Sequence, residues 1–348
     1  MHYSDINNLS SFLSRHASLF HGKRLLVCGQ LQSVSLAPLI SEPNTTFLIS
    51  DYSVFNNLQT TTGTPKNPKL LYGFCLDTTE QRFDAVLLFM PKAKQEAVLW
   101  LSSVLPWLKL NGEIFVIGEN RGGISAAPKL LLPYTAKAQK LDSARHCSLF
   151  YAVMTNPPVS FVAESLLTQY SLPLTHTASP LVISALPGVF SAKELDEGTN
   201  LLLDSLPELS GDILDIGCGA GVIGATVCQR MPDTIVTMTD INALALFSAK
   251  ETLKQNNLTA TVVASDMFSD IQGKFDFIIS NPPFHAGLNT NYEATERFLR
   301  QAASYLKKEG QLILVANKFL RYEPILAEVF RSVSIIRENN RFKIIKAF

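Results

Sequence analysis

Hydrophobic positions in the second half of the chain fall into short runs separated by stretches with helical spacing. The short runs predict strands at residues 212–216, 234–239, 261–264, 275–280 and 311–315. Helical spacing predicts helices at 192–203, 222–230, 243–255 and 293–308. Two final runs, 333–337 and 341–348, enclose a polar turn and predict a hairpin. Such alternation is typical of an α/β fold with a mostly parallel sheet covered on both faces.

The first half of the chain shows the same alternation more weakly. Apolar runs predict strands at 24–28, 46–50, 83–90 and 112–117, and helical spacing predicts a helix at 95–108. Two similar halves indicate a duplication. Prolines interrupt any regular pattern between residues 155 and 187. We therefore expect a first domain at 1–160, a linker at 161–187 and a second domain at 188–348.

Composition excludes several classes of protein. The chain has 348 residues, and its hydrophobic content of 47% argues against intrinsic disorder. No apolar run approaches the ~18–20 residues that span a bilayer, and the first residues lack the pattern of an export signal. Five cysteines at scattered spacings fit reduced thiols. We expect a cytoplasmic protein with no membrane association and no obligatory protein partner.

The net charge of zero hides an uneven distribution. Residues 1–160 carry 14 basic and 10 acidic side chains, residues 161–299 carry 6 and 16, and residues 300–348 carry 10 and 4. The middle of the chain is therefore acidic and both flanks are basic. The neutral average argues against a strongly basic nucleic-acid binder, but the flanks remain available to face a polyanion.

A glycine-rich turn follows the strand at 212–216. It contains Asp215, Gly217, Cys218, Gly219 and Gly221. Glycines at such a turn let the backbone approach a ligand closely, although a tight turn without a ligand explains them as well. An aspartate here would repel a pyrophosphate. It suits a cationic ligand instead, such as the ammonium and sulfonium groups of S-adenosylmethionine.

Two further aspartates follow the next two predicted strands. Asp240, followed by Ile241, can accept hydrogen bonds from a ribose diol, and Asp266, followed by Met267, is placed to meet an adenine amino group beside an apolar wall. Each aspartate alone could be a helix cap. Their positions after successive strands favour a cofactor crevice.

The sequence Asn281-Pro282-Pro283-Phe284 directly follows the strand at 275–280. Two prolines fix the backbone, so the Asn281 side-chain oxygen and the Pro282 carbonyl can form a rigid pair of acceptors. Such a pair polarises an exocyclic amine that attacks a methyl carbon, and Phe284 offers a stacking face for a base. The structural alternative is a rigid loop.

These motifs resemble the class I S-adenosylmethionine-dependent methyltransferases that modify exocyclic amines. More narrowly, the chain resembles the RsmC family of ribosomal RNA methyltransferases along nearly its whole length. The narrower resemblance is carried by the segments 118–121, 141–145, 186–191, 281–285 and 341–343.

The resemblance implies two tandem Rossmann-like domains from a duplication. The second would hold a seven-stranded catalytic sheet whose last strand is antiparallel, and the first would be a degenerate RNA-docking and stabilising module. It also implies S-adenosylmethionine as cofactor, methylation of guanine N2 at position 1207 of 16S ribosomal RNA, and the small ribosomal subunit as partner. The first domain has Gln30 and Pro91 where the second has its glycine loop and Asn281, so we expect it to bind no cofactor.

Three alternative functions remain open from the residues alone. Adenine-N6 and a protein glutamine amide present a planar NH₂ to the same acceptors. The chain could also be a catalytically silent RNA-binding or ribosome-assembly factor that retains a cofactor pocket, but binding alone would not require both acceptors.

Several other residues are candidates with structural alternatives. His285 could touch substrate or pack in its loop, and Phe190 could cover the cofactor or pack in the core. Cys218 is expected to be an apolar filler rather than a nucleophile. The dispersed histidines predict no metal site. Basic side chains that could contact phosphate or remain solvated are Lys92, Lys94, Arg121, Arg145, Arg337, Arg341, Lys343 and Lys346.

Overall fold

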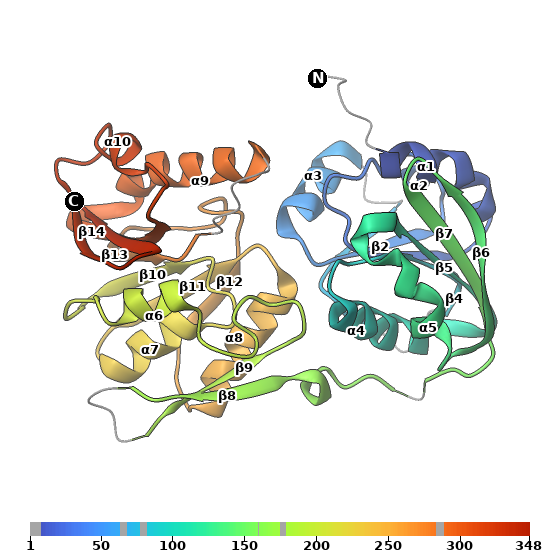
Figure 1. Ribbon diagram of the computed structural model, residues 1–348, viewed down its shortest axis with the longest axis horizontal. Coiled ribbons are helices and arrows are strands. Elements are labelled where there is room, and N and C mark those ends of the chain that lie inside the picture. The colour runs from blue at the N-terminus through green and yellow to red at the C-terminus, as the bar shows by residue number, and fades with distance from the viewer. Residues whose placement is uncertain (1–7, 63–67, 77–81, 159, 175–178, 283–288) are drawn as a thin grey trace. The chain divides into compact units, whose positions relative to one another are not determined.

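The chain forms two compact units, Met1–Leu166 and Leu167–Phe348. The structure is a computed structural model, and it describes residues 8–62, 68–76, 82–158, 160–174, 179–282 and 289–348. Each unit is built around its own seven-stranded sheet (Figure 1).

The second unit contains the sheet that carries the predicted motifs. Its strand order is β12-β11-β10-β13-β14-β16-β15, and β16 runs antiparallel to both of its neighbours. The predicted seven-stranded sheet with an antiparallel last strand is therefore confirmed. The strands are β10 (Asp212–Ile216), β11 (Ile235–Asp240), β12 (Thr261–Ala264), β13 (Phe275–Ser280), β14 (Leu306–Asn317), β15 (Val333–Glu338) and β16 (Phe342–Ala347).

Helices cover both faces of this sheet. Figure 1 shows α9 and α10 on one face and α6, α7 and α8 on the other. Phe298 and Leu299 of α9 are buried against Ile278 and Leu312 of the sheet, where they form one face of the core. The helices are α6 (Glu197–Leu203), α7 (Val222–Arg230), α8 (Ala243–Gln255), α9 (Asn289–Ala302) and α10 (Glu323–Leu326).

The first unit repeats the same sheet. Its strand order is β3-β2-β1-β4-β5-β7-β6. The seven-stranded sheet of the second unit has the same order, with β10 in the place of β1 and β16 in the place of β7. The strands are β1 (Leu25–Gly29), β2 (Thr45–Ile49), β3 (Lys69–Tyr72), β4 (Phe83–Phe89), β5 (Leu108–Glu119), β6 (Thr135–Ala144) and β7 (Cys147–Met154).

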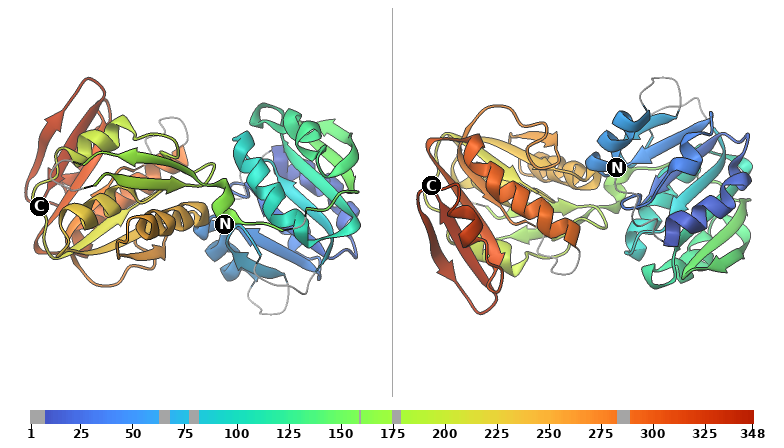
Figure 2. Two further views of the ribbon diagram at one scale, coloured as in Figure 1. Left: turned by 90° about the horizontal axis from the view of Figure 1, so that it is seen from below. Right: turned by 90° about the horizontal axis from the view of Figure 1, so that it is seen from above.

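The helices of the first unit also lie on two faces. The two views of Figure 2 show α4 and α5 on one face, and α1 and α3 on the other. Phe12 and Leu13 of α1 are buried against Phe115 and Leu149 of the sheet. The helices are α1 (Asn8–His16), α2 (Ala37–Ile40), α3 (Tyr52–Thr62), α4 (Lys94–Val104) and α5 (Ala127–Leu131), with 3₁₀ turns η1 (Ala17–Phe20), η2 (Leu105–Trp107), η3 (Asn120–Gly122) and η4 (Ile124–Ala126).

The duplication extends to individual side chains. In the first unit, Lys109 at the start of β5 donates to Asp84 of β4 at 2.5 Å. In the second unit, Lys307 at the start of β14 donates to Asp276 of β13 at 2.7 Å. Each aspartate also accepts a backbone N–H from the start of the neighbouring strand. Asp84 accepts from Arg24, just before β1, and Asp276 accepts from Asp212, the first residue of β10. The same ion pair at the same place supports descent of both units from one ancestral domain.

The range expected as a linker, 161–187, contains regular structure. After η5 (Ala163–Leu166), β8 (Thr168–Leu172) and β9 (Leu181–Ala185) form an antiparallel hairpin that belongs to the second unit. The prolines interrupt the sequence pattern outside these strands. Hydroxyls of α8 accept backbone N–H groups of β9 and of the residue after it, which holds β9 in place.

Three predicted helices have wrong boundaries. The helix expected at 95–108 ends at Val104, where η2 follows and leads into β5. The helix expected at 192–203 begins at Glu197, because the Asp196 carboxylate caps it by accepting the Thr199 N–H at 2.9 Å. The helix expected at 293–308 gives way to η6 (Ala303–Tyr305), and Leu306 already pairs with Phe275 in the sheet. Within the described ranges, no helix combines the length and apolar composition needed to cross a membrane.

Candidate active site

The predicted motifs meet at the carboxyl ends of three neighbouring strands. Parallel pairing of β10 with β13 places Ile216 opposite Ser280, so Gly217 and Asn281 leave the sheet side by side. Pairing of β10 with β11 places Ile216 opposite Thr239, so Asp240 lies at the same edge. Ligands of open α/β sheets bind at this edge.

The glycine loop depends on a backbone conformation that favours glycine. Gly217, Gly219 and Gly221 have φ angles of 72°, 54° and 81°. At Gly221 a side chain would also crowd Ala249, with a Cβ 3.1 Å from it. Hydrogen bonds from the Gly217 and Cys218 N–H groups to the Thr239 carbonyl tie the loop to β11. The loop is therefore a fixed cradle with open space beside Gly217.

Asp215 is fully buried beneath this loop. One carboxylate oxygen, Oδ2, accepts the Gly224 N–H at 2.9 Å, whereas the other, Oδ1, is buried and has no hydrogen-bond partner in the structure. Burial is the main cause that raises the pKa of Asp215 from 3.8 to about 7, with a smaller contribution from the nearby charge of Asp240. A buried acceptor without a partner fits a ligand that brings positive charge or N–H donors.

Asp240 holds the loop and reaches the same edge. Its Oδ2 accepts the Gly219 N–H and its Oδ1 accepts the Asn242 N–H, both at 2.9 Å. A carboxylate accepts hydrogen bonds at about four positions, which is the chemistry that a ribose diol requires. Ile241, next in sequence, is partly buried. Burial, followed by the charges of Asp240 and Asp215, holds the pKa of Cys218 well above its usual range, which keeps this thiol protonated and unsuited to nucleophilic attack.

Asp266 and Met267 follow β12 as predicted. Asp266 also has a basic neighbour that the sequence did not indicate. Arg297 of α9 lies 3.6 Å from the Asp266 carboxylate. Met267 adopts a φ of 53° and packs against the core beside α9. The carboxylate thus lies at the same edge of the sheet as Asp240, next to the apolar side chain of Met267.

The side chain of Asn281 is held in one orientation. Its Nδ2 donates to Thr199 Oγ1 at 2.7 Å and to Asp196 Oδ2 at 3.2 Å. Both N–H bonds of the amide are therefore engaged, and Oδ1 is directed away from them as a fixed acceptor. Pro282 is buried, while Pro283, Phe284 and His285 lie outside the described residues.

The sequence did not indicate the two residues that orient Asn281. Asp196 and Thr199 lie more than eighty residues before it, at the start of α6. An aspartate followed by a glutamate at the start of an expected helix is a recognisable N-cap signal, which would have located the helix start. It would not have shown that the same carboxylate also reaches Asn281.

Phe190 lies beside the glycine loop, not in the core. Its ring is exposed, with 58% of the residue accessible, and its backbone oxygen is 3.8 Å from the position of a Cβ on Gly219. Next to it, Ser191 has a φ of 57° and a buried hydroxyl without a partner. The exposure of Phe190 excludes the core-packing alternative.

The residues at this edge fit S-adenosylmethionine. Asp215 offers an unsatisfied buried acceptor for a cationic amine, the loop leaves backbone space, and Asp240 and Asp266 present carboxylates at successive strand ends. No group of three or more metal-ligating side chains occurs in the described part of the chain.

The corresponding edge of the first unit is filled differently. Leu31, after β1, is buried in the core, and the Gln32 amide donates to Asp51 at 3.0 Å, as the Gly219 N–H does to Asp240 in the second unit. The side chains of Leu31 and Gln32 thus occupy the place that the glycine loop has in the second unit.

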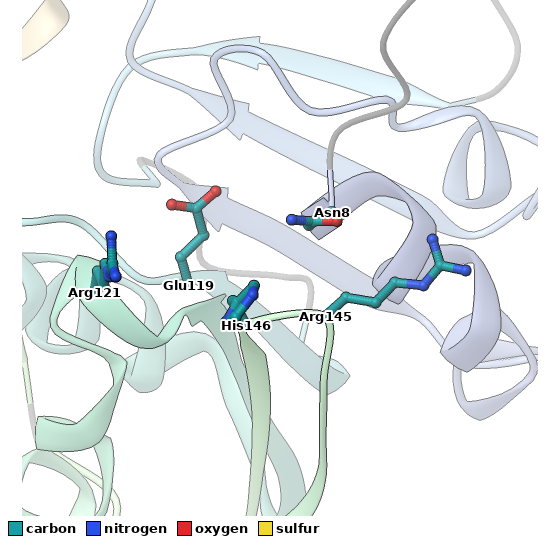
Figure 3. Close-up of a pocket in the computed structure, with 5 residues that line it drawn as sticks. All are labelled: Asn8, Glu119, Arg121, Arg145 and His146. Carbon is teal, nitrogen blue, oxygen red and sulfur yellow. The ribbon is translucent and has the colours of Figure 1, made fainter.

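The basic residues singled out in the sequence have different roles. Lys343 is buried and paired with Glu323, and the Arg337 guanidinium donates to the Asp204 carbonyl, so both are structural. Arg121 and Arg145 lie on opposite sides of a hollow of about 220 Å³, which Asn8, Glu119 and His146 also line (Figure 3). Among the described residues, neither of these arginines makes an ion pair.

Family models match both units. The methyltransferase small domain matches residues 180–346, and the N-terminal methyltransferase small domain matches residues 10–170. Fold and matched domains together define a class I S-adenosylmethionine-dependent methyltransferase.

Curated relatives narrow this class. Ribosomal RNA small subunit methyltransferase C of Aeromonas hydrophila is 47% identical over 342 residues, which cover 98% of each chain. The protein of the same name from Vibrio vulnificus is 40% identical over 339 residues, with 97% of each chain covered. The chain belongs to the ribosomal RNA small subunit methyltransferase C family.

A solved structure has the same two-unit fold. It is the T. thermophilus 16S rRNA N2 G1207 methyltransferase in complex with AdoMet and guanosine. The TM-score is 0.84 at 23% identity, with 99% of this chain and 92% of that chain covered. The predicted tandem Rossmann-like fold is confirmed.

Proposed function

We propose that this chain methylates the exocyclic N2 amine of a guanine in 16S ribosomal RNA, at position 1207. The small ribosomal subunit is the proposed partner, and the cytoplasm, where thiols remain reduced, is the proposed location. The names of the curated relatives and of the T. thermophilus structure support the substrate. The observation that carries the chemistry is the fixed orientation of the Asn281 amide.

In this proposal one group of residues binds the cofactor and another binds the amine that is methylated. S-adenosylmethionine, when bound, supplies an electrophilic methyl group on a good leaving group. Asp215 accepts from its cationic amine, Asp240 from its ribose, and Asp266 from its adenine, while the loop from Gly217 to Gly221, with Cys218, and the side chains of Ile241 and Met267 enclose it. The positions of these residues at one edge of the sheet support this assignment.

Asn281 and Pro282 prepare the amine for attack. Oδ1 of Asn281 and the carbonyl of Pro282 each accept one amine hydrogen, which reduces conjugation of the nitrogen lone pair with the base. Thr199 and Asp196 prevent the amide from presenting its NH₂ group instead. The amine then loses a proton to solvent as its new N–C bond forms. Pro283 would stiffen the turn and Phe284 would stack on the base.

The first unit is proposed to dock RNA and to bind no cofactor. Its hollow with Arg121 and Arg145 provides unpaired cations, and Leu31 and Gln32 occupy the place of a cofactor loop. We place the functional boundary between the units in the range 161–187, with catalysis assigned to residues 188–348.

Methyl transfer from labelled cofactor to small subunits, free 16S RNA, DNA and a glutamine-containing protein tests the proposal. We expect label in RNA, at N2 of guanine 1207 by mass mapping. Label only in adenine N6 of DNA or in protein would contradict it, and no transfer to any substrate would favour a silent assembly factor.

The Asn281 orientation can be tested in the same assay. Asn281→Ala removes the acceptor, and we expect kcat to fall at least 100-fold. Thr199→Val leaves the acceptor but frees the amide to rotate, so a smaller loss of about 10-fold in kcat is expected, with Thr199→Ser restoring activity. Cofactor affinity should stay unchanged in all three. Full activity of Asn281→Ala would exclude the polarisation mechanism.

A further inference from the structure

A second hollow lies beside the active site in the second unit. Its volume is about 650 Å³, and it is formed where β14 ends and where the turn between β15 and β16 comes close. The residues that line it are Asn317, Lys318, Phe319, Asn340 and Arg341. None of them belongs to the proposed cofactor or amine site.

The hollow combines an exposed aromatic ring with two cations. Phe319 is 67% accessible, although it is a large apolar residue. The Arg341 side chain is 70% exposed and lies over the Phe342 ring, 5.3 Å from its centroid. Lys318 is held 3.0 Å from Glu338 by an exposed ion pair. Single exposed apolar residues are common. An exposed aromatic ring in a hollow with two cations suits a nucleotide, because the base can stack on the ring and the phosphate can contact the cations.

Helix α6 links this hollow to the catalytic turn. Glu197, the first residue of α6, accepts from Arg341 at 2.7 Å. Asp196, its neighbour in sequence, accepts from the Asn281 amide. The pairing of Ser280 with Leu314 also places the ends of β13 and β14 at the same edge of the sheet. A strand of RNA whose target base reaches Asn281 would therefore have its neighbouring nucleotide near Phe319.

The duplicated unit shows which part of this hollow is specific. In the first unit, the Asn120 N–H donates to the His146 carbonyl at 2.7 Å, and in the second the Lys318 N–H donates to the Arg341 carbonyl at 2.8 Å. The hollow of Figure 3 therefore occupies the same place in the fold. Arg121 stands there where Phe319 stands in the second unit, so only the catalytic unit presents an aromatic ring at this position.

We propose that this hollow is a subsite for an unstacked RNA nucleotide next to the target guanine. The Phe319 ring stacks on its base, and Arg341 and Lys318 contact its phosphate. Both cations are held by exposed ion pairs, which contribute little and can be exchanged for a phosphate. Stacking on a phenyl ring is available to any base, so the subsite contributes affinity and position without reading sequence. This inference rests on the proposed function.

Steady-state methyl transfer to small subunits tests the subsite in the full chain. We expect Phe319→Ala to raise KM for the RNA substrate roughly 5- to 50-fold with little change in kcat, and Phe319→Trp to retain the parent KM. Arg341→Ala should weaken RNA binding and reduce the slope of log affinity against log salt by about one, whereas Phe319→Ala should leave the slope unchanged.

Two control variants separate the subsite from general surface effects. Ile235→Ala removes an equally exposed apolar side chain, 66% accessible, at the amino end of β11. Arg331→Ala removes an exposed positive charge before β15, at the end opposite the turn. Both should keep the parent KM and salt slope. Cofactor affinity, measured by calorimetry, should be unchanged in every variant.

The outcomes distinguish this subsite from the proposed function. If the parent chain methylates guanine in RNA but Phe319→Ala keeps its KM, the subsite is wrong and the proposed function stands. If Ile235→Ala raises KM as much as Phe319→Ala, the effect is not local and the subsite is also wrong. No transfer to RNA by the parent chain would overturn both.

Discussion

At the scale of single residues, the site contains charges and polar atoms that are not fully satisfied by the protein. Asp215 is completely buried, yet one of its carboxylate oxygens has no partner. The neighbouring segment holds the buried Ser191 hydroxyl, which also lacks one. Buried polar groups without partners destabilise a fold, so their presence at the cofactor edge is consistent with a ligand that completes them.

Asp215 predicts opposite effects of one substitution on stability and on binding. Its pKa is raised from 3.8 to about 7 in the folded chain, so between about pH 4 and 7 the folded state keeps a proton that the unfolded state releases. Stability without cofactor therefore falls as pH rises through this window, by roughly 4 kcal/mol in all. Asp215→Asn removes this cost, because the amide oxygen can still accept from Gly224.

We expect Asp215→Asn to raise the free energy of unfolding of the cofactor-free chain at pH 8, and to have little effect near pH 4. It should also weaken cofactor binding and abolish the loss of affinity that we expect for the parent chain below pH 7, where Asp215 becomes protonated. Urea unfolding and calorimetry at several pH values measure both effects. Lower stability at pH 8 would show that Asp215 is not a destabilising charge.

At the scale of elements, strand β9 pairs with β8 along one edge and hydrogen-bonds to side chains of helix α8 along the other. Ser248 and Thr252 of α8 accept the backbone N–H groups of Leu186 and Ser184, both at 3.0 Å. Asn256 accepts from Val182 at 2.8 Å. Four residues of helix rise about 6 Å and two residues of strand about 6.6 Å, so the two repeats match.

Thr252 makes two of these hydrogen bonds, because its hydroxyl also donates to the Ser184 carbonyl. We expect Thr252→Val to lower the free energy of unfolding by about 1–3 kcal/mol, since it leaves buried backbone groups without partners. Thr226→Val is the matched control: Thr226 is equally buried, but its hydroxyl donates only to a carbonyl within its own helix. Equal losses in the two variants would contradict the role of α8.

At the scale of the whole molecule, duplication has produced two sheets of one design with different edges. The Asp84–Lys109 and Asp276–Lys307 pairs are retained at the base of both sheets. The carboxyl edge has diverged, because Leu31 and Gln32 fill the first unit where the second has its glycine loop. The two units therefore share a scaffold and differ at the edge where the second unit carries its proposed site.

If the first unit docks RNA, its free arginines should contribute to affinity. We expect the double variant Arg121→Ala with Arg145→Ala to weaken RNA binding and reduce its salt slope by about two, without changing cofactor affinity. The control removes the same charge at exposed positions elsewhere in the unit, with Lys129→Ala and Lys137→Ala. Filter binding at several salt concentrations measures both, and an equal effect of the control would indicate general electrostatic attraction.

Sequence by itself determined most strands and helices of the catalytic sheet in the second unit, and the positions of its motifs. The strands at 212–216, 261–264 and 275–280 and the helices at 222–230 and 243–255 were predicted with their observed bounds. Apolar runs and helical spacing report burial directly, which is why these local elements were predictable. In the first unit β3, β6 and β7 were missed. The partly exposed β3 and β6 contain no apolar run that would have predicted them. The largely buried β7 does contain such a run and was predictable from the sequence.

Only the tertiary structure showed which residues act together. The contacts of Asn281 with Thr199 and of Arg341 with Glu197 join residues more than eighty positions apart. The hairpin β8–β9 was likewise expected to be a linker, because its stability depends on α8 and not on its own pattern. Sequence periodicity records whether a residue is buried, whereas its partner is set by how strands and helices pack, so the amide orientation and the second hollow became visible only in the fold.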